Sequence, residues 1–169
     1  CELMDGYIEA ESTPSIGSTF SFSIKLELAD QLISSTHQSQ NNTELLVSDA
    51  SILVAEDNKA NQLVIREMFK RMGLSMDIAE NGRRAIEMVE QYHYDLIFMD
   101  ISMPEMDGME TCRAIRSMTD EKTCQIPIIA LTAHSLSGDK EQFLDAGMND
   151  YLSKPIRLSQ LIEKINLFL

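Results

Sequence analysis

Short apolar runs alternate with amphipathic segments from Ser51 to the C-terminus, with a few loop residues between them. Such runs are typical of buried strands, and apolar residues spaced three or four apart are typical of helices. Strands that alternate with helices predict a parallel sheet, because each parallel pair needs a long crossover connection. Residues 51–169 are therefore expected to form one α/β domain.

Five strands are predicted, each bounded by polar or turn-forming residues. They are ILVAE from Ile52 to Glu56, LSMDIA around Met76 and Ile78, LIFM from Leu96 to Met99, IIAL from Ile128 to Leu131, and DYL from Asp150 to Leu152. The first, third and fourth are continuously apolar, as expected for central strands that helices cover on both faces.

Five helices are expected to complete the pattern. The first should end at Gly73, a residue type that commonly follows a helix. Its core-facing side is expected to consist of Leu63, Val64, Met68 and Met72. The last helix has the clearest period, carried by Leu158, Leu161, Ile162, Ile165 and Leu169.

Residues 1–50 have a different character. Alternating residues and turn signals in 1–28 predict a β-hairpin, with one face made of Phe20, Phe22, Ile24 and Leu26. A lone hairpin buries too little apolar surface to be stable, so this piece is expected to come from a larger sheet. Residues 29–50 are rich in Ser, Gln, Asn and Thr and are predicted to be a linker.

Composition excludes several classes of function. The 169 residues carry 14 Lys and Arg against 27 Asp and Glu, a formal charge of −13, so a nonspecific nucleic-acid binder is not expected. No apolar run approaches the roughly 20 residues of a membrane span, so no direct membrane contact is expected. Three cysteines without metal-like or redox-like spacing indicate reduced thiols and a cytoplasmic location.

Polar residues follow the carboxyl ends of the predicted strands. Glu56 and Asp57 end the first strand, and Asp100 ends the third. Thr132 ends the fourth, and Lys154 follows the fifth. In an open parallel sheet the reactive site lies outside these ends. Three carboxylates that converge there would repel one another, and a divalent cation would relieve that repulsion.

The expected cation is Mg²⁺, which binds carboxylates, waters and phosphate oxygens in near-octahedral geometry. Asp57 and Asp100 are expected to be direct ligands, and Glu56 is expected to act through water. The backbone carbonyl of Ser102 could supply a further oxygen. An ionised Asp100 needs no general base, so it could attack phosphorus directly and form an aspartyl phosphate.

Two further residues suit this chemistry. The ammonium of Lys154 and the hydroxyl of Thr132 would neutralise the charge on the transferred phosphoryl group. Taken singly, each residue has a plainer explanation: Asp100 could cap a turn, Thr132 could cap a helix, and Lys154 could be a surface lysine. Their joint placement at strand ends favours phosphoryl transfer.

Five ordered motifs resemble those of a response-regulator receiver domain. They are the acidic pair in VAEDNKAN, the aspartate in IFMDISMPEMDG, the hydroxyl in ALTA, an aromatic residue three positions before a lysine, and SKP. The resemblance covers residues 51–169 and implies a flavodoxin-like (βα)5 three-layer sandwich with sheet order 2-1-3-4-5.

The resemblance also implies a role for each site residue. Asp100 would be the phosphorylated residue, Glu56 and Asp57 would form the acid pocket, and Thr132 and Lys154 would sense the phosphoryl group. Glu56 departs from the family's commoner Asp by one methylene. The longer arm favours a water-mediated role over direct coordination.

A conformational switch follows from the same resemblance. Tyr151 would turn inward when Thr132 is drawn to the phosphoryl group, which would reshape the face of the fourth helix, fifth strand and fifth helix. A cis peptide bond would join Lys154 to Pro155 and orient the lysine.

The implied function is a phosphorelay. Asp100 would take a phosphoryl group from the histidine of a histidine-kinase core and pass it to a histidine phosphotransfer domain, whose helices would dock near the first helix. Ser102 and His134 would modulate the access of water to the phosphoryl group and so set its lifetime. The switch face could also form a homodimer.

A second resemblance covers residues 1–28, where MDGYIEAESTPSIGSTFSFSIKLEL looks like the last strands of a histidine-kinase ATPase domain. The order of segments then resembles the C-terminal part of a hybrid sensor histidine kinase, a class whose cytoplasmic part can be membrane-anchored. The dimerisation helices, the phosphodonor histidine and the Asn-bearing ATP motifs do not occur in this sequence, so ATP binding by that route is not expected.

Rival hypotheses come from other classes. An aspartate-nucleophile phosphatase of the haloacid dehalogenase type also uses Asp, Thr and Lys, but it needs a second Asp where this sequence has Ser102. A pseudo-receiver would be a binding module that is not phosphorylated, although the residues for phosphorylation are present. A flavodoxin-like cofactor binder is weaker still, because EDNKAN lacks the Gly, Ser and Thr donors that cradle phosphate.

Overall fold

The chain divides into two compact units, Cys1–Gln40 and Asn41–Leu169. A computed structural model describes residues 6–13, 17–23, 25, 50–133 and 139–169. The predicted linker 29–50 lies outside these residues except for its last position, and so do Ile24, Leu26 and His134. None of the helices in the described ranges has the length and apolar character that crossing a bilayer requires.

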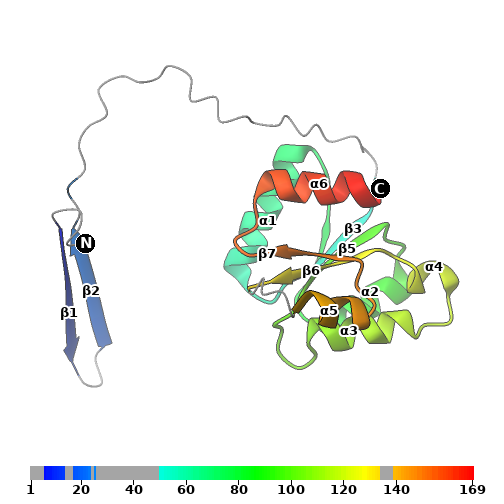
Figure 1. Cartoon of the computed structure of the whole chain (residues 1–169), viewed down its shortest axis with the longest axis horizontal. Helices are drawn as coiled ribbons and strands as arrows, with labels where there is room; N and C mark the ends of the chain where they lie inside the picture. The colour runs from blue at the N-terminus through cyan, green and yellow to red at the C-terminus, as the bar shows by residue number, and fades with distance from the viewer. Residues whose placement is uncertain (1–5, 14–16, 24, 26–49, 134–138) are drawn as a thin grey trace, which may run out of the picture. The chain divides into compact units, whose positions relative to one another are not determined.

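The first unit contains an antiparallel hairpin of β1 (Tyr7–Thr13) and β2 (Gly17–Ser23) (Figure 1). Ile8 pairs with Phe22 and Ala10 pairs with Phe20, so one face of the hairpin is apolar. Among the described residues of this unit the aromatic side chains of that face are largely exposed: Phe20 is 73% exposed and Phe22 is 70% exposed. The prediction of a hairpin is confirmed, and its apolar face faces water.

The second unit is built on a five-stranded parallel sheet of order β4-β3-β5-β6-β7. Its strands, in chain order, are β3 (Ile52–Ala55), β4 (Asp77–Ala79), β5 (Leu96–Asp100), β6 (Ile128–Thr132) and β7 (Asp150–Ser153). This arrangement confirms the predicted order 2-1-3-4-5. All five predicted strands occur, and their ends differ from the prediction by at most one residue, except that β4 begins at Asp77, three residues after the start of the predicted LSMDIA strand.

Helices cover both faces of this sheet, as Figure 1 shows. They are α1 (Lys59–Met72), α2 (Gly82–Gln91), α3 (Gly108–Arg116), α4 (Glu121–Cys124), α5 (Asp139–Asp145) and α6 (Leu158–Phe168). Successive strand residues point to opposite faces. Leu53 and Ile97 therefore pack with α2, α3 and α5, whereas Val54 and Phe98 pack with α1 and α6. Two separate apolar cores result.

The predicted core side of α1 is partly wrong. Leu63 and Val64 are 69% and 52% exposed, and the helix instead buries Ile65 and Phe69 against the sheet. Both sets have helical spacing, so periodicity alone could not choose between them. The predicted end at Gly73 is confirmed, because Gly73 has φ +72° and its N–H closes the last turn.

The segment between α3 and β6 holds one element that was not predicted, the four-residue helix α4. Asp120 caps it by accepting hydrogen bonds from the N–H and the hydroxyl of Thr123, at 2.8 and 2.7 Å. Nearby, Arg116 at the end of α3 donates to the carbonyls of Gly147 and Cys124 at 2.9 and 2.8 Å. These contacts fix the loops at the amino end of the sheet.

Candidate functional site

The sheet brings the predicted site residues together at its carboxyl end. Glu56 follows β3 directly, Asp100 is the last residue of β5, and Lys154 follows β7. One carboxylate oxygen from each of Glu56, Asp57 and Asp100 lies within 4.8 Å of the others. We call Glu56, Asp57, Asp100 and Lys154 the acidic pocket. Parallel strands in register place these residues side by side although they are far apart in sequence.

Lys154 bridges two of the three carboxylates. Its ammonium donates to Glu56 Oε2 and to Asp100 Oδ2, both at 2.7 Å. The Glu56 side chain is fully buried and that of Asp100 is nearly so. The backbone N–H of Lys154 donates to the carbonyl of Thr132 at 2.7 Å, and the Lys154–Pro155 peptide bond is cis. Main-chain contacts as well as ion pairs therefore hold the lysine in the pocket.

The acidic pocket holds three carboxylates and one ammonium, and the pKa values of Asp100 and Lys154 are shifted there. Burial raises the pKa of the Asp100 carboxyl and outweighs the opposing effect of Lys154. Burial also tends to lower the pKa of Lys154, but its hydrogen bonds to Asp100 and Glu56 prevail, and that pKa is raised. Three carboxylates thus share one compensating ammonium.

This donor set fits a hard divalent cation. Clustered carboxylate oxygens with excess negative charge are the ligands that Mg²⁺ prefers, and they would bind it in the company of water. Asp57 is half-buried, so one side of the cluster is open to solvent. Glu56, Asp57 and Asp100 are therefore the residues that would hold such an ion.

The backbone around Asp100 is tightly packed. The N–H of Ser102 donates to Asp100 Oδ1 at 3.2 Å, which orients the carboxylate. A Cβ atom at Gly108, the first residue of α3, would lie 2.2 Å from the carbonyl oxygen of Asp100. Only glycine fits there, so α3 starts directly against the backbone of Asp100. The glycine in the PEMDG sequence thus serves close packing.

Glu56 has partners that the sequence analysis did not identify. Its Oε1 accepts from Asn61 Nδ2 at 2.9 Å and from the backbone N–H of Asn58 at 3.2 Å. Gln62 Nε2 donates to the Glu56 carbonyl at 2.6 Å. The available signal was the run of amide side chains in EDNKANQ, which opens α1 immediately after the acidic pair.

The other predicted residues lie around this cluster. Thr132 ends β6 and is buried, and it pairs with Ser153 in the residue register of β6 and β7. Tyr151 is half-buried on β7, and its ring lies 6.3 Å from that of Phe143 between centroids. Ser102 is exposed in the loop after β5. The structure therefore brings Thr132 to the same end of the sheet as the acidic pocket.

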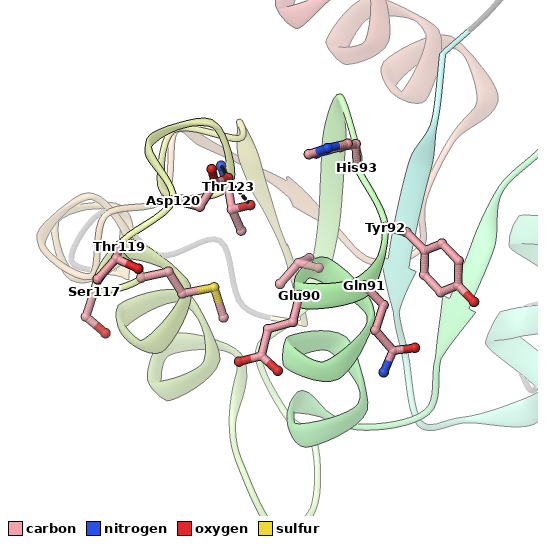
Figure 2. A pocket seen from close by; sticks show the side chains of 10 residues that line it. Glu90, Gln91, Tyr92, His93, Ser117, Thr119, Asp120 and Thr123 are labelled. Atoms are coloured by element: carbon pink, nitrogen blue, oxygen red, sulfur yellow. Dashed lines mark hydrogen bonds between the residues drawn. The ribbon is translucent and has the colours of Figure 1, made fainter.

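A cavity of about 460 Å³ lies away from the acidic pocket, between the end of α2 and the segment joining α3 to α4 (Figure 2). Asp120, one of its carboxylates, already accepts the two hydrogen bonds from Thr123. These bonds lower the pKa of Asp120.

Comparisons with known proteins agree with this geometry. The family described as "Response regulator receiver domain" matches residues 52–166. The receiver domain of sensor histidine kinase PA1611 from Pseudomonas aeruginosa, crystallised with magnesium in its active-site cleft, is 40% identical, with a TM-score of 0.65 over 70% of this chain and 96% of that one. The Saccharomyces cerevisiae complex of the histidine phosphotransfer protein Ypd1 with the Ssk1 receiver domain matches at 31% identity and a TM-score of 0.67, over 72% of this chain and 89% of that one.

Curated relatives extend the similarity into the first unit. Hybrid signal transduction histidine kinase K of Dictyostelium discoideum is 36% identical over 98% of this chain, which spans 14% of that protein. Sensor protein EvgS of Escherichia coli is 35% identical over 94% of this chain, which spans 13% of its length. With its matched residues, its sheet order and its strand-end cluster, the chain belongs to the response-regulator receiver domain family.

Proposed function

We propose that this chain is a Mg²⁺-dependent phosphoacceptor in a phosphorelay, with Asp100 as the phosphorylated residue. The observation that carries the proposal is the arrangement of Asp100 itself. It is a buried carboxylate with two further carboxylates beside it and Lys154 bonded to one of its oxygens at 2.7 Å. The carboxylate form of such a group can attack without a general base, and here it is oriented and next to a cation that can stabilise added negative charge.

Each residue of the acidic pocket has a part in this transfer. An Asp100 oxygen attacks phosphorus and forms an O–P bond while the P–N bond of the donor phosphohistidine breaks, and the donor imidazole keeps the electron pair. Lys154 and the hydroxyl of Thr132 stabilise the equatorial oxygens. Glu56, Asp57 and Asp100 would hold Mg²⁺, and its positive charge would offset the repulsion between these carboxylates and the incoming phosphoryl group.

The phosphorylated state is read out through the edge of the sheet. Thr132 on β6 and Tyr151 on β7 lie on neighbouring strands, two positions apart in register. A shift of Thr132 toward a phosphoryl group on Asp100 leaves room that the half-buried Tyr151 ring can enter. The face affected is that of α5, β7 and α6.

The partner proposed for this chain is a histidine phosphotransfer domain, and α1 is the surface for it. Leu63 and Val64 are apolar, exposed and close to the acidic pocket in sequence and along the helix. Beside them is a cavity of about 180 Å³ lined by Val64, Lys154, Pro155 and Ile156. An apolar helix face beside a phosphoacceptor suits a partner that must bring its histidine close to Asp100.

The first unit fits a larger parent protein. We propose that residues 1–28 end a histidine-kinase ATPase domain, that 29–50 are a linker, and that 51–169 are the receiver domain. The exposed apolar face of the hairpin supports this, because a strand pair needs more strands or a covering layer to be stable. The parent would then be a hybrid histidine kinase that works in the cytoplasm.

Incubation with Mg²⁺ and a small phosphodonor such as phosphoramidate tests the phosphoacceptor function. The chain is expected to gain the mass of one phosphoryl group, and the Asp100→Asn variant is expected to gain none. Failure of the wild-type chain to gain mass would point to a pseudo-receiver. Multiple turnover of a simple phosphate ester would instead point to a phosphatase.

Transfer to a partner is tested separately. A phosphorylated histidine phosphotransfer domain is mixed with the chain, and the loss of its label is followed over time. Leu63→Ala and Val64→Ala are expected to slow this transfer while leaving labelling by phosphoramidate unchanged, because the small donor needs no docking surface.

A further inference from the structure

We infer that Asn61 is a positioning residue that adapts the acidic pocket to a glutamate, by holding Glu56 in the orientation that metal binding requires. The inference rests on the proposed function, because it concerns the same Mg²⁺ site. It adds a residue outside the carboxylate cluster whose amide acts only through Glu56.

The Glu56 side chain has to be held in place by its neighbours. A glutamate has one more rotatable bond than an aspartate, so its carboxylate needs more contacts to stay in one place. Glu56 is fully buried, which makes an unfixed carboxylate there expensive. Some group must therefore fix each oxygen of its tip.

The two oxygens of Glu56 are held by different groups. Oε2 accepts from Lys154 at 2.7 Å, a contact that faces Asp100. Oε1 accepts from Asn61 Nδ2 at 2.9 Å and from the N–H of Asn58 at 3.2 Å. The contacts to Oε1 come from the start of α1 and leave Oε2 directed at the rest of the acidic pocket. The neutral donors Asn61 and Asn58 thus hold Oε1, and this orients Oε2 toward the acidic pocket.

The position of Asn61 excludes a plainer explanation. The cap of α1 is Asn58, whose side chain accepts from the N–H groups of Ala60 and Asn61. The Asn61 amide is not needed for that cap, and within the described part of the chain its hydrogen bond is to Glu56. Asn61 also lines one cavity with Val64 and Lys154, which places it beside the pocket. The Asn61 side chain therefore holds the Glu56 carboxylate and does not cap α1.

The test measures metal affinity directly by isothermal titration calorimetry with Mg²⁺, and by the electron paramagnetic resonance signal of Mn²⁺. Asn61→Ala is expected to bind Mg²⁺ about tenfold more weakly, the usual effect of losing a group that orients a metal ligand. Alanine favours helix, so the variant is expected to fold. At saturating Mg²⁺ its labelling by phosphoramidate should stay within about twofold of wild type, because Asp100 is untouched.

Measuring Asn61→Ala in the Glu56→Asp variant as well shows whether Asn61 acts through Glu56 or affects the metal site in general. In Glu56→Asp the side chain is one methylene shorter and is expected to fall short of the Asn61 amide, which lies 2.9 Å from Oε1 in the wild-type chain. Adding Asn61→Ala to that variant is therefore expected to change Mg²⁺ affinity by less than about twofold, in a double-mutant cycle. Gln91→Ala is the matched control, since it removes an exposed amide from the end of α2 and should leave Mg²⁺ affinity unchanged.

The outcomes distinguish this inference from the proposed function. Wild-type affinity in Asn61→Ala would overturn the inference, and so would an equal loss in both backgrounds, while labelling of Asp100 would still stand. A tenfold loss confined to the Glu56 background in a chain that is never labelled would support the positioning role and reject the phosphoacceptor. A wild-type chain that binds no Mg²⁺ would overturn both.

Discussion

The two ends of the five-stranded sheet use similar polar residues in opposite ways. At the carboxyl end, three carboxylates compete for one ammonium, that of Lys154. At the amino end, Arg116 donates to two carbonyls and to Asn149 Oδ1, which also accepts from the N–H of Ile128. Negative charge is in excess at the carboxyl end, whereas at the amino end the donors of Arg116 meet neutral acceptors. The clustered carboxylates lie at the end where we propose phosphoryl transfer.

The pKa directions of two aspartates express the same contrast. Burial raises the pKa of Asp100, whereas the hydroxyl and N–H of Thr123 lower the pKa of Asp120. Asp120 borders the larger of the two cavities described above, and yet it serves only to cap a short helix. Cavity volume is therefore a poor guide to the chemistry here, and the electrostatic state of each carboxylate is a better one.

The largest expected effect comes from replacing one aspartate by asparagine at each end of the sheet. Asp100→Asn is expected to reduce phosphoramidate labelling by more than about 100-fold, because it removes the nucleophile. Asp120→Asn is expected to label at the wild-type rate. Mass spectrometry over time measures both, and equal labelling of Asp100→Asn and wild type would contradict the contrast.

The next effect concerns Lys154 and Arg116, two half-buried cations at opposite ends of the sheet. Lys154→Ala is expected to slow labelling about 100-fold, because it removes the ammonium that bonds Asp100 and that we propose stabilises the transferred phosphoryl group. Arg116→Ala, at the other end, is expected to label normally whenever it is folded. Labelling rates of both variants are measured at saturating Mg²⁺. A comparable slowing in both would show that the amino end of the sheet also contributes to labelling.

Arg116→Ala is instead expected to reduce stability. The change removes charge-assisted hydrogen bonds to Gly147, Cys124 and Asn149, and it takes this donor from two backbone carbonyls, whereas Asn149 Oδ1 keeps the N–H of Ile128. A loss of about 2–4 kcal/mol in the free energy of unfolding follows. Urea denaturation of the metal-free chain measures this loss, and an unchanged midpoint would mean that the network contributes little.

The smallest effect is a pH dependence of opposite sign at the two ends. With its raised pKa, Asp100 contributes stability that is fully present below its unfolded-state pKa and is lost as pH rises through the folded value. Metal-free Asp100→Asn is therefore expected to unfold at a higher temperature than wild type at neutral pH. Its advantage should shrink as the pH falls through the folded pKa of Asp100.

Asp120 provides the opposite trend. Its pKa is lowered, so its stabilising contribution exists above the unfolded-state pKa and is lost as pH falls through the folded value. Asp120→Ala is expected to unfold a few degrees below wild type at neutral pH, with a difference that vanishes in acid. Thermal unfolding followed by circular dichroism at several pH values tests both aspartates, and parallel trends would refute the contrast.

Sequence patterns predicted the sheet well because burial on both faces requires continuous apolar runs, as in β3, β5 and β6. They failed on α1, since Leu63 and Val64 have the spacing of core residues but lie on the surface. They also missed α4, because four residues are too few to show a helical period. Periodicity detects an apolar face, but it does not reveal what covers that face.

The site was predicted to the extent that topology determines it. Carboxylates and a lysine at strand ends must meet at the carboxyl end of a parallel sheet, and Glu56, Asp100 and Lys154 do so. The role of Asn61 was not predicted, because a contact between two side chains depends on rotamers that leave no periodic trace. Contacts of this kind are visible only in three dimensions.

Ile8, Phe20 and Phe22 form an exposed apolar patch on the hairpin. Patches of this kind favour self-association, so we expect the hairpin to promote aggregation of the purified chain whether or not Asp100 is phosphorylated. A shorter polypeptide starting at Ala50 keeps both apolar cores and omits the hairpin. Light scattering and crystal growth then report on the signalling module alone.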